Sequence, residues 1–400
     1  MMIERAEYLQ KLKDFADKKL IKVITGIRRC GKSTLFEMFK DHLLKNNVFE
    51  EQIQFINFED ADWEYLMDYK ALHKHIKEHL QKDKMNYIFL DEVQNVPNFQ
   101  KAIDSLYIKN NVDLYITGSN AYLLSGEIAT LLSGRYIEIK MLPLSFKEYV
   151  SSFPDKTDLS RKYRDYLTNS SFPYTLELNA DKALIRNYLE GIYNSVILKD
   201  IVSRKKIADV LMLESVIRFM FDNIGGLVSI KKISDTMTSA GRKISTHTVE
   251  NYLTALVDSY ILHRVGRYDV KGKQYLKTGE KYYLTDLGLR YFLLGTKAAD
   301  DGRVLENIIY LELIRRDYEV YVGKVAENEV DFVAIKDGYT EYYQVAHTVR
   351  SPETLKRELR SLENISDHNS KYLITLDDDP AVSHNGIRQI NAIDWLSPAP

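Results

Sequence analysis

Gly26-Ile-Arg-Arg-Cys-Gly31-Lys32-Ser33 is the most informative segment of this sequence. It fits the pattern G-x-x-x-x-G-K-[ST] without deviation. A short β-type run, Leu20–Thr25, precedes it, and an amphipathic helical segment, Thr34–Leu44, follows it. The backbone N–H groups of such a loop surround a phosphate, and the N-terminus of the next helix adds a partial positive charge. The stretch therefore predicts a phosphate-binding loop between a strand and a helix.

The residue types in this loop indicate a nucleotide and a metal ion as ligands. Lys32 is expected to act in catalysis by reaching the β- and γ-phosphates of ATP, and the Ser33 hydroxyl is expected to ligate Mg²⁺. A chance match of the pattern is the alternative, and the strand and helix on either side argue against it. The residues expected to contact the nucleotide are Gly26, Ile27, Arg28, Arg29, Cys30, Gly31, Lys32, Ser33 and Thr34.

The second half of the same site is expected at Tyr87-Ile-Phe-Leu-Asp91-Glu92. Apolar residues followed by two acids indicate a buried strand that carries carboxylates to the C-terminal edge of a sheet, where ligands bind in open α/β folds. Asp91 is expected to hold Mg²⁺, and Glu92 is expected to polarise the attacking water as a catalytic residue. A strand that simply ends in a charged turn is the alternative.

Two further segments supply candidates for catalytic residues. The run Asp113-Leu-Tyr-Ile-Thr-Gly-Ser119-Asn120 again ends a strand in polar residues. Ser119 or Asn120 is therefore expected to position the water near the γ-phosphate, and an ordinary turn is the alternative. Arg135 comes just before the last β-type run and is expected to act as an arginine finger on a neighbouring subunit. For Arg135, a cap on the preceding helix is the alternative.

Short β-type runs alternate with helix-length segments over the first part of the chain. This alternation predicts an α/β fold with a parallel sheet covered by helices on both faces. Residues 142–205 then have helical character, with a loop around residues 151–158. The five β-type runs are Leu20–Thr25, Gln52–Phe58, Tyr87–Asp91, Asp113–Thr117 and Tyr136–Lys140.

The bulk composition narrows the class of protein. A chain of 400 residues is too long for one ordinary core, so several domains are expected. The formal net charge of −2 gives no global basic field, so any nucleic-acid surface must be a local patch. No apolar run is long enough to span a membrane, and the N-terminus lacks the apolar segment of a signal peptide. The single cysteine, Cys30, excludes an internal disulfide, and a cytoplasmic protein without a membrane partner is expected.

The combination of motifs resembles the prokaryotic AAA-type ATPases that carry a C-terminal region of unknown function. The likeness covers essentially the whole chain. It implies a P-loop NTPase sheet of five parallel strands, an arginine finger at Arg135 and a homo-oligomer. Where that group tends to have Gly-Gly-Phe-Pro, this chain has Ser170-Ser-Phe-Pro173, which is expected to stiffen a lid-like region. Besides the phosphate loop and Asp91–Gln94, the likeness rests on Thr117–Asn120, Leu131–Arg135, Met141–Tyr149, Tyr188–Tyr193 and Lys199–Ile201.

Residues 206–295 are predicted to form a winged-helix domain, which the same group carries. Helical segments at 211–224, 229–240 and 245–260 precede β-type runs at 261–268 and 281–285. The third helix would be the recognition element for DNA, but it contains no Lys or Arg. Duplex DNA would have to be held by the flanking basic residues, and packing against a protein partner is the alternative. Those flanking residues are Lys231, Lys232, Arg242, Lys243, Arg264, Arg267, Lys271, Lys273 and Lys277.

Residues 296–400 are predicted to form an α/β domain that resembles the restriction-endonuclease-like, PD-(D/E)xK nucleases. Glu306 on a helix, Asp331 on a strand and Gln344 on the next strand follow the order of that pattern. The position of the catalytic Lys holds Ala346, so the cleavage mechanism lacks one component. Glu306, Asp331 and Gln344 could still hold a vestigial metal ion. A former nuclease scaffold that serves as a docking surface is the alternative.

The sequence thus predicts four regions: an ATPase core at 1–141, a helical lid or connector at 142–205, the winged helix at 206–295 and the nuclease-like domain at 296–400. Three functions stay open. The first is a Mg²⁺-dependent ATPase whose cycle moves the C-terminal modules, with DNA as a candidate partner. The second is a slow ATP-dependent switch that controls a protein-binding surface without nucleic acid. The third is an ATP-gated DNA nuclease.

Overall fold

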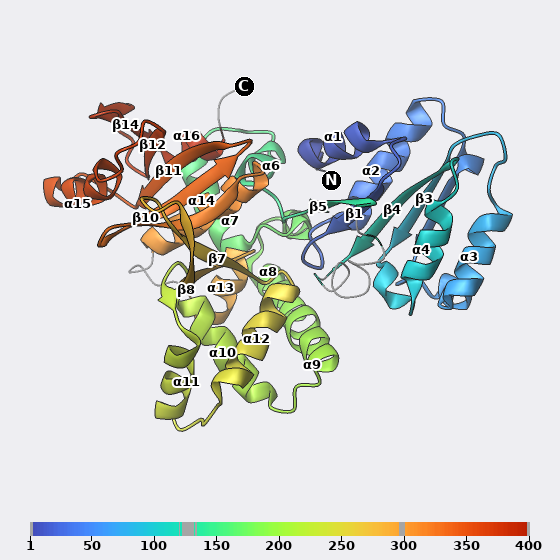
Figure 1. The fold of residues 1–400 in the computed structure, drawn as a ribbon, viewed down its shortest axis with the longest axis horizontal. Helices are drawn as coiled ribbons and strands as arrows, with labels where there is room; N and C mark the ends of the chain where they lie inside the picture. Colours follow the sequence, from blue (N-terminus) through green and yellow to red (C-terminus); the bar gives the residue numbers. More distant parts are fainter. Residues whose placement is uncertain (1–2, 120, 122–131, 133, 296–300, 398–400) are drawn as a thin grey trace. The chain divides into compact units, whose positions relative to one another are not determined.

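Two sheets organise the chain, and its contacts divide it into two units (Figure 1). The computed structural model describes residues 3–119, 121, 132, 134–295 and 301–397. One unit comprises Met1–Pro143 with Asp258–Tyr260, and the other comprises Leu144–Val257 with Ile261–Pro400. Among the described residues, no helix combines the length and the apolar character that crossing a membrane requires.

The first unit alternates strands and helices, as its β-type runs predict. Each of the five strands ends within one residue of the predicted limits, so the predicted α/β sheet is confirmed. The elements are α1 (Ala6–Phe15), β1 (Ile21–Thr25), α2 (Lys32–Lys45), β2 (Ile53–Asn57), α3 (Tyr69–Glu78), β3 (Asn86–Asp91), α4 (Phe99–Tyr107), β4 (Val112–Gly118) and β5 (Tyr136–Lys140), with short 3-10 turns at Glu50–Gln52, Ala61–Leu66 and Val93–Asn95.

The order of these strands positions the candidate site. The sheet runs β2-β3-β4-β1-β5, and every neighbouring pair is parallel. The C-terminal ends of all five strands therefore lie along one edge. Because β4 lies between β1 and β3, the end of β4 separates the phosphate loop from Asp91. Polar residues from three strands consequently meet at this edge.

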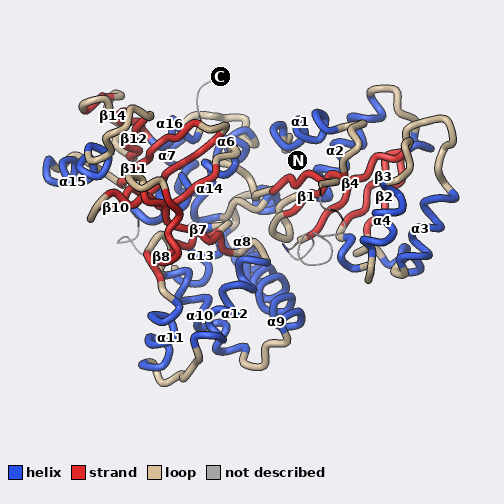
Figure 2. Tube along the Cα trace, in the orientation of Figure 1, coloured by secondary structure: helices blue, strands red, loops and turns tan. Residues whose placement is uncertain are grey.

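Helices cover both faces of this sheet (Figure 2). On one face, Phe36 of α2 packs against Phe89 of β3, and Phe39 packs against Tyr115 of β4, with ring centroids 5.1 Å apart in both pairs. On the other face, α3 and α4 bury their apolar residues together with alternate residues of the strands. Because both faces are buried, the strands are apolar at consecutive positions, as in other parallel sheets.

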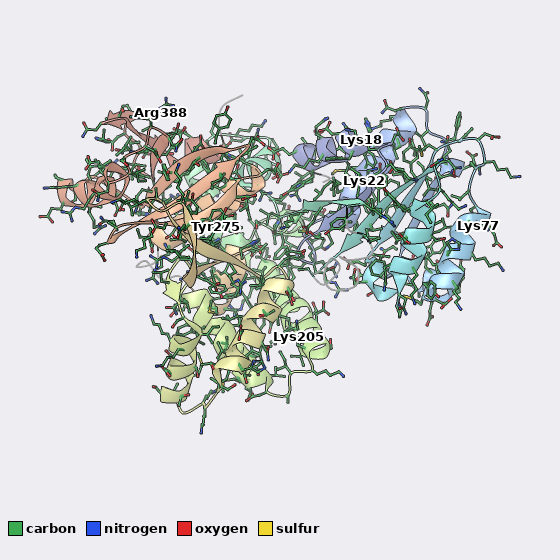
Figure 3. All side chains as sticks on the ribbon, in the orientation of Figure 1. Lys18, Lys22, Lys77, Lys205, Tyr275 and Arg388 are labelled. Carbon is green, nitrogen blue, oxygen red and sulfur yellow. The ribbon has the colours of Figure 1, made fainter. Side chains whose placement is uncertain are left out.

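One lysine is fully buried inside β1. Lys22, labelled in Figure 3, forms an ion pair with Asp113 of β4, and its Nζ donates to the Lys18 carbonyl at 2.9 Å. The Tyr115 hydroxyl and the Asp17 N–H donate to the other oxygen of Asp113 at 2.7 and 2.9 Å. Burying an ion pair requires hydrogen bonds of this kind for the remaining polar atoms. The network stabilises the N-terminal edge of the sheet, opposite to the phosphate loop.

The second unit begins with helices and continues as mixed α/β structure. Its helices are α6 (Phe146–Ser151), α7 (Leu159–Asn169), α8 (Lys182–Ile192), α9 (Asp200–Lys205), α10 (Val210–Asp222), α11 (Ile230–Ser239), α12 (Thr246–Asp258), α13 (Leu287–Leu294), α14 (Asp301–Arg315), α15 (Pro352–Glu363) and α16 (Ala392–Leu396). Its strands are β6 (Leu227–Val228), β7 (Leu262–Asp269), β8 (Gln274–Leu284), β9 (Glu319–Val325), β10 (Asn328–Lys336), β11 (Tyr339–Ala346), β12 (Ser370–Thr375), β13 (Val382–His384) and β14 (Ile387–Asn391). A 3-10 turn at Pro173–Leu178 and a π-helix at Tyr193–Lys199 complete it.

One sheet joins parts of the second unit that the sequence predicts as separate domains. Its order is β13-β14-β12-β11-β10-β9-β7-β8-β6. The hairpin β7–β8, expected to be a wing, enters this sheet because β7 pairs in parallel with β9, with Arg267 opposite Val322. The boundaries expected at 205/206 and 295/296 therefore do not separate compact units. The boundary expected after residue 141 lies close to the observed division after Pro143.

The segment Ser170-Ser171 has a conformation that explains why glycine suits it. Ser170 has φ 80° and ψ 152°, in a region that favours glycine. The Ser170 hydroxyl donates to Asp286 Oδ2 at 2.9 Å, and the N–H and hydroxyl of Ser171 each donate to the same oxygen at 2.7 Å. Burial raises the pKa of Asp286, and these donors oppose that rise. The two serines thus bind the segment to the N-terminus of α13, and the stiffening of a lid-like region stays a prediction.

Candidate nucleotide-binding site

The phosphate loop joins β1 to α2 through a backbone that few residue types adopt easily. Gly26, Arg29 and Gly31 have φ angles of 151°, 73° and 104°. A Cβ at position 26 would lie 2.1 Å from the Met141 carbonyl oxygen, so only glycine fits this close approach. Turns of this kind direct successive N–H groups toward one side and create an anion-binding concavity. The backbone geometry is therefore that of a phosphate cradle.

Lys32 begins α2 and is buried within the loop, with 4% of its surface exposed. Its Nζ lies 3.2 Å from the Gly26 carbonyl oxygen, 3.4 Å from Ser119 Oγ and 3.3 Å from Glu92 Oε1. Burial lowers the pKa of Lys32, but the neighbouring Cys30 and Glu92 raise it by more. The side chain is therefore held as an ammonium, the form that can bind phosphate oxygens.

Asp91 ends β3 and fits the requirements of a magnesium site. Its Oδ1 accepts a 2.5 Å hydrogen bond from the Thr117 hydroxyl, and the Ser33 side chain also hydrogen-bonds this carboxyl. Burial raises the pKa of Asp91, although both hydroxyls lower it. The other oxygen, Oδ2, is buried and has no hydrogen-bond partner among the described residues. A buried carboxylate oxygen without a donor, beside a serine hydroxyl, suits Mg²⁺ or one of its water ligands.

Glu92 follows Asp91 in a left-handed conformation, with φ 53° and ψ 45°. The Ser119 Oγ lies 2.5 Å from both of its carboxylate oxygens, and Gln94 donates to one of them. Burial raises the pKa of Glu92, but the Lys32 ammonium and the Ser119 hydroxyl lower it by more, so the net shift is downward. The carboxylate is therefore an anion that faces Lys32.

Thr117 links the two acids, a role that the sequence does not suggest. Its hydroxyl oxygen accepts the Glu92 N–H at 2.8 Å and donates to Asp91 Oδ1. Thr117 is fully buried near the end of β4. The only signal in the sequence is its position in the polar end of the strand that also carries Ser119. The position of β4 between β1 and β3 turns that end into the centre of the site.

The remaining predicted loop residues take different positions. Ile27 is buried, Arg28 forms an ion pair with Glu59, and Arg29 is exposed. Thr34 is half-buried in the first turn of α2. Asn120 lies outside the described residues. Contact of these residues with a nucleotide stays a prediction.

Cys30 is buried inside the phosphate loop rather than open at its surface. Burial raises the pKa of the Cys30 thiol, and the positive charges of Lys32 and Arg5 oppose that rise. A buried thiol in its neutral form reacts slowly with thiol reagents. Modification of Cys30 would therefore report opening of the loop.

Arg135 lies at the opposite edge of the sheet from the phosphate loop. It directly precedes β5, whose first residue, Tyr136, pairs with Ile21 at the start of β1. Five residues of strand, about 16 Å at the usual rise, separate it from the loop-bearing edge. Arg135 forms an ion pair with Asp104 of α4 and lies over the Tyr107 ring. It is therefore not part of the site in its own chain, and action on a neighbouring subunit stays a prediction.

The acids predicted in the C-terminal region surround a lysine. Lys281 Nζ lies 2.8 Å from Glu306 Oε1, 2.8 Å from Glu329 Oε1 and 3.7 Å from Asp331 Oδ1. Burial lowers the pKa of Lys281, but the three carboxylates raise it by more. Burial, and next the charge of Glu306, raises the pKa of Asp331 well above its ordinary value. An ammonium thus occupies the position between the acids.

Gln344 is turned partly away from this group. Its amide nitrogen donates to Glu358 at 2.8 Å, and its oxygen lies 3.4 Å from the Asp331 N–H. Among the described residues, no group of three or more His, Cys, Asp or Glu has an arrangement that could hold a metal ion. A metal ion at Glu306, Asp331 and Gln344 would therefore have to displace Lys281. Phosphodiester cleavage at these residues stays a prediction.

The sheet order, the phosphate loop after β1 and the acids that end β3 define an AAA-type P-loop ATPase domain. In agreement, the model of the AAA domain family matches residues 18–150. A domain of unknown function matches residues 160–300.

Two relatives identify the family of the whole chain. An uncharacterized protein of Haemophilus influenzae is 41% identical over 399 residues, which cover 99% of this chain and 98% of the relative. An uncharacterized protein of Methanocaldococcus jannaschii is 31% identical over 364 residues, covering 86% and 78% of the two chains. The chain therefore belongs to the same protein family as these two.

Three solved structures are similar to this chain. A Walker-type ATPase of Pyrococcus abyssi is 15% identical, with a TM-score of 0.48 and coverage of 73% of this chain and 95% of that one. Cdc6p of Pyrobaculum aerophilum is 12% identical, with a TM-score of 0.32 and coverage of 78% and 95%. The Orc1 protein of Aeropyrum pernix, solved in complex with DNA, is 13% identical, with a TM-score of 0.30 and coverage of 79% and 94%.

Proposed function

We propose that the chain binds ATP with Mg²⁺ at the phosphate loop and hydrolyses it to ADP and phosphate. One observation carries this proposal: Lys32 and Glu92, from opposite sides of β4, meet at 3.3 Å beside an Asp91 oxygen without a described donor. Phosphoryl transfer to water needs a cation that binds the phosphates, a carboxylate that activates the water and an oxygen that can ligate a metal ion. Lys32, Glu92 and Asp91 supply these three groups.

Each residue has a separate task in this proposal. The loop backbone and Lys32 hold the phosphates and stabilise the charge that develops on them. Ser33 and Asp91 hold Mg²⁺, which neutralises charge on the phosphate oxygens when bound. Glu92 orients the attacking water and accepts a proton from it as a general base. Ser119 and Thr117 fix the two carboxylates by hydrogen bonds, which keeps the water and the metal ion in separate positions.

Binding of ATP requires an exchange of partners in this site. Lys32 pairs with Glu92 in the structure, whereas the proposed reaction requires Lys32 to face phosphate oxygens. The phosphate oxygens would replace Glu92 as the partner of the Lys32 ammonium. The Glu92 carboxylate would then be able to bind water. Because Ser119 bonds both oxygens of Glu92 and also lies near Lys32, it is placed to hold Glu92 during this exchange.

Replacement of Lys32 tests the binding step. We expect Lys32→Met to weaken binding of a non-hydrolysable ATP analogue about 10- to 100-fold, because a charged hydrogen bond to phosphate is lost. Titration of a fluorescent analogue in the presence of Mg²⁺ measures this change. The matched control is Lys40→Met in the same helix, whose ammonium makes a surface ion pair with Glu50. Equal affinity of the Lys32 variant and wild type would contradict the proposal.

A second use of the same site is a slow switch that holds ATP and exposes a partner-binding surface. The observation that favours it is the ion pair between Lys32 and Glu92, which must separate before the carboxylate can reach water, while Gln94 and Ser119 hold the carboxylate in place. The steady-state rate of phosphate release decides between the two: sustained turnover supports the ATPase, whereas tight binding with almost no turnover supports the switch.

A role on DNA rests on basic residues in the second unit. Lys231, Lys232, Lys271 and Lys273 are exposed, whereas Arg242 donates to Ser215 and the Leu211 carbonyl. We propose the β7–β8 turn as the point of contact, because it carries two of the exposed lysines. An electrophoretic shift that weakens with salt and with loss of Lys271 and Lys273 would support it. Absence of a shift at low salt would leave a protein partner as the remaining proposal.

A further inference from the structure

The segment that precedes α1 contributes a buried arginine to the back of the phosphate loop. Arg5 is 3% exposed. One terminal nitrogen, Nη1, donates to the Cys30 carbonyl at 2.9 Å, and the other, Nη2, donates to the Leu142 carbonyl at 2.7 Å. Nη2 also lies 3.4 Å from the Pro143 carbonyl, and the guanidinium covers the Tyr8 ring at 4.9 Å. A planar guanidinium thus bridges two backbone segments that are far apart in sequence.

The phosphate loop meets residues 141–143 at both of its ends. At its start, Gly26 approaches the Met141 carbonyl so closely that no side chain fits between them. Near its end, the Cys30 carbonyl is joined to Leu142 through Arg5. Met141 is itself fixed, because its N–H donates to the Thr25 carbonyl at 2.7 Å. Arg5 therefore links the second half of the loop to this fixed segment.

We propose that Arg5 is a positioning residue of the nucleotide site. By holding the Cys30 carbonyl outward, it keeps the N–H groups of the following residues directed toward the phosphates. The proposal rests on the proposed ATP-binding function, but the fixing of the loop can be measured without any nucleotide. The hydrogen bonds of its side chain go to the backbone carbonyls of Cys30, Leu142 and Pro143.

The geometry sets the choice of variants. A lysine at position 5 keeps the positive charge but lacks the two diverging N–H groups that reach Cys30 and Leu142 together. Arg5→Lys therefore removes the bridge with the smallest change in charge near the Cys30 thiol. Arg5→Met removes both the bridge and the positive charge. The matched control is Tyr8→Phe, which removes the hydroxyl that accepts the Leu142 N–H at 3.1 Å but leaves the arginine and the ring in place.

The first measurement is the rate at which a thiol reagent modifies Cys30, the only cysteine of the chain, in the protein without nucleotide. Cys30 is fully buried, so wild type should react slowly. We expect Arg5→Lys to raise the rate at least about tenfold, and Tyr8→Phe to leave it nearly unchanged. Should Arg5→Met fail to fold, Arg5→Lys still decides the question. Equal rates in Arg5→Lys and wild type, or equal acceleration in Tyr8→Phe, would overturn the proposal.

The second measurement is binding of a non-hydrolysable ATP analogue at a temperature where all variants are folded. A positioning role predicts at least about tenfold weaker binding for Arg5→Lys and unchanged binding for Tyr8→Phe. A merely structural role would lower the melting temperature and leave the affinity intact, which would also overturn the proposal. If wild type itself binds no analogue, the ATP-binding function fails, whereas the thiol rates still decide whether Arg5 fixes the loop.

Discussion

A chain with Glu92→Gln is expected to bind ATP normally and to hydrolyse it about 10²–10⁴ times more slowly than wild type. Glutamine keeps the size of the side chain and can still accept a hydrogen bond from Ser119. It cannot draw a proton from water, however, and it carries no charge to pair with Lys32. Loss of that pair removes a competitor for the phosphates, so binding should not weaken. Phosphate release at saturating ATP and Mg²⁺, with separate titration of a non-hydrolysable analogue, measures the two effects.

The matched control for this prediction is Glu78→Gln on α3. Glu78 is an exposed glutamate in the same unit and forms a surface ion pair with Lys74. Its replacement should change neither binding nor turnover. Turnover by the Glu92 variant within about twofold of wild type would show that Glu92 does not act on the water. Parallel loss of binding and turnover would instead indicate that Glu92 shapes the site rather than the chemistry.

Local patterns were sufficient to predict the first unit. The strands there are short apolar runs between helices, and both faces of the sheet are covered, so each run is visible in the sequence without knowledge of its partners. The pairing of the phosphate loop with Asp91 and Glu92 was also predictable, because carboxyl ends of parallel strands share one edge. The order of the strands was not predictable, since it depends on contacts between residues that are far apart in the sequence. The role of Thr117 depends on that order and was therefore missed.

The second unit shows the limits of the same reasoning. The helices α10, α11 and α12 lie within two residues of their predicted limits. The sequence did not predict that β7 pairs with β9, because this register involves Arg267 and Val322, which no local pattern connects. For this reason the sequence predicts the winged helix and the nuclease-like domain as separate modules, whereas in the structure one sheet joins them. Independent movement of the two would require the shared backbone hydrogen bonds of this continuous sheet to break.

Lys281 was missed for a related reason. The strand that carries it was predicted only from residue 281 onward, whereas β8 begins at Gln274. Its partners lie on α14 and β10, so the acids of a nuclease-like pattern were predictable from the sequence but the cation between them was not. The vacant Lys position at Ala346 suggested an incomplete site. The structure instead places Lys281, from the strand β8, among these acids, where it forms ion pairs with all three carboxylates.

Replacement of Lys281 by methionine is expected to destabilise the second unit by about 3–5 kcal/mol, the usual cost of leaving buried charges without their partner. Trp63 and Trp395 are the two tryptophans of the chain and lie in different units. In a Trp63→Phe background, unfolding in urea followed by Trp395 fluorescence would therefore report the second unit alone. Lys271→Met, which removes an exposed lysine from the turn before β8, is the matched control and should change stability little.

The pH dependence of that variant distinguishes charge from packing. Burial and Glu306 already raise the pKa of Asp331 in the folded protein, so the folded state binds protons more readily than the unfolded one. Stability from such a group falls as pH rises, and removal of the Lys281 charge, which holds the pKa of Asp331 down, should raise that pKa further. The loss in Lys281→Met should therefore be smaller near about pH 5 than near about pH 8. A second change, Glu306→Gln, should restore part of the stability at the higher pH. A loss that is equal at both pH values, and that Glu306→Gln does not reduce, would mean that Lys281 acts by filling space and that the three carboxylates do not depend on its charge.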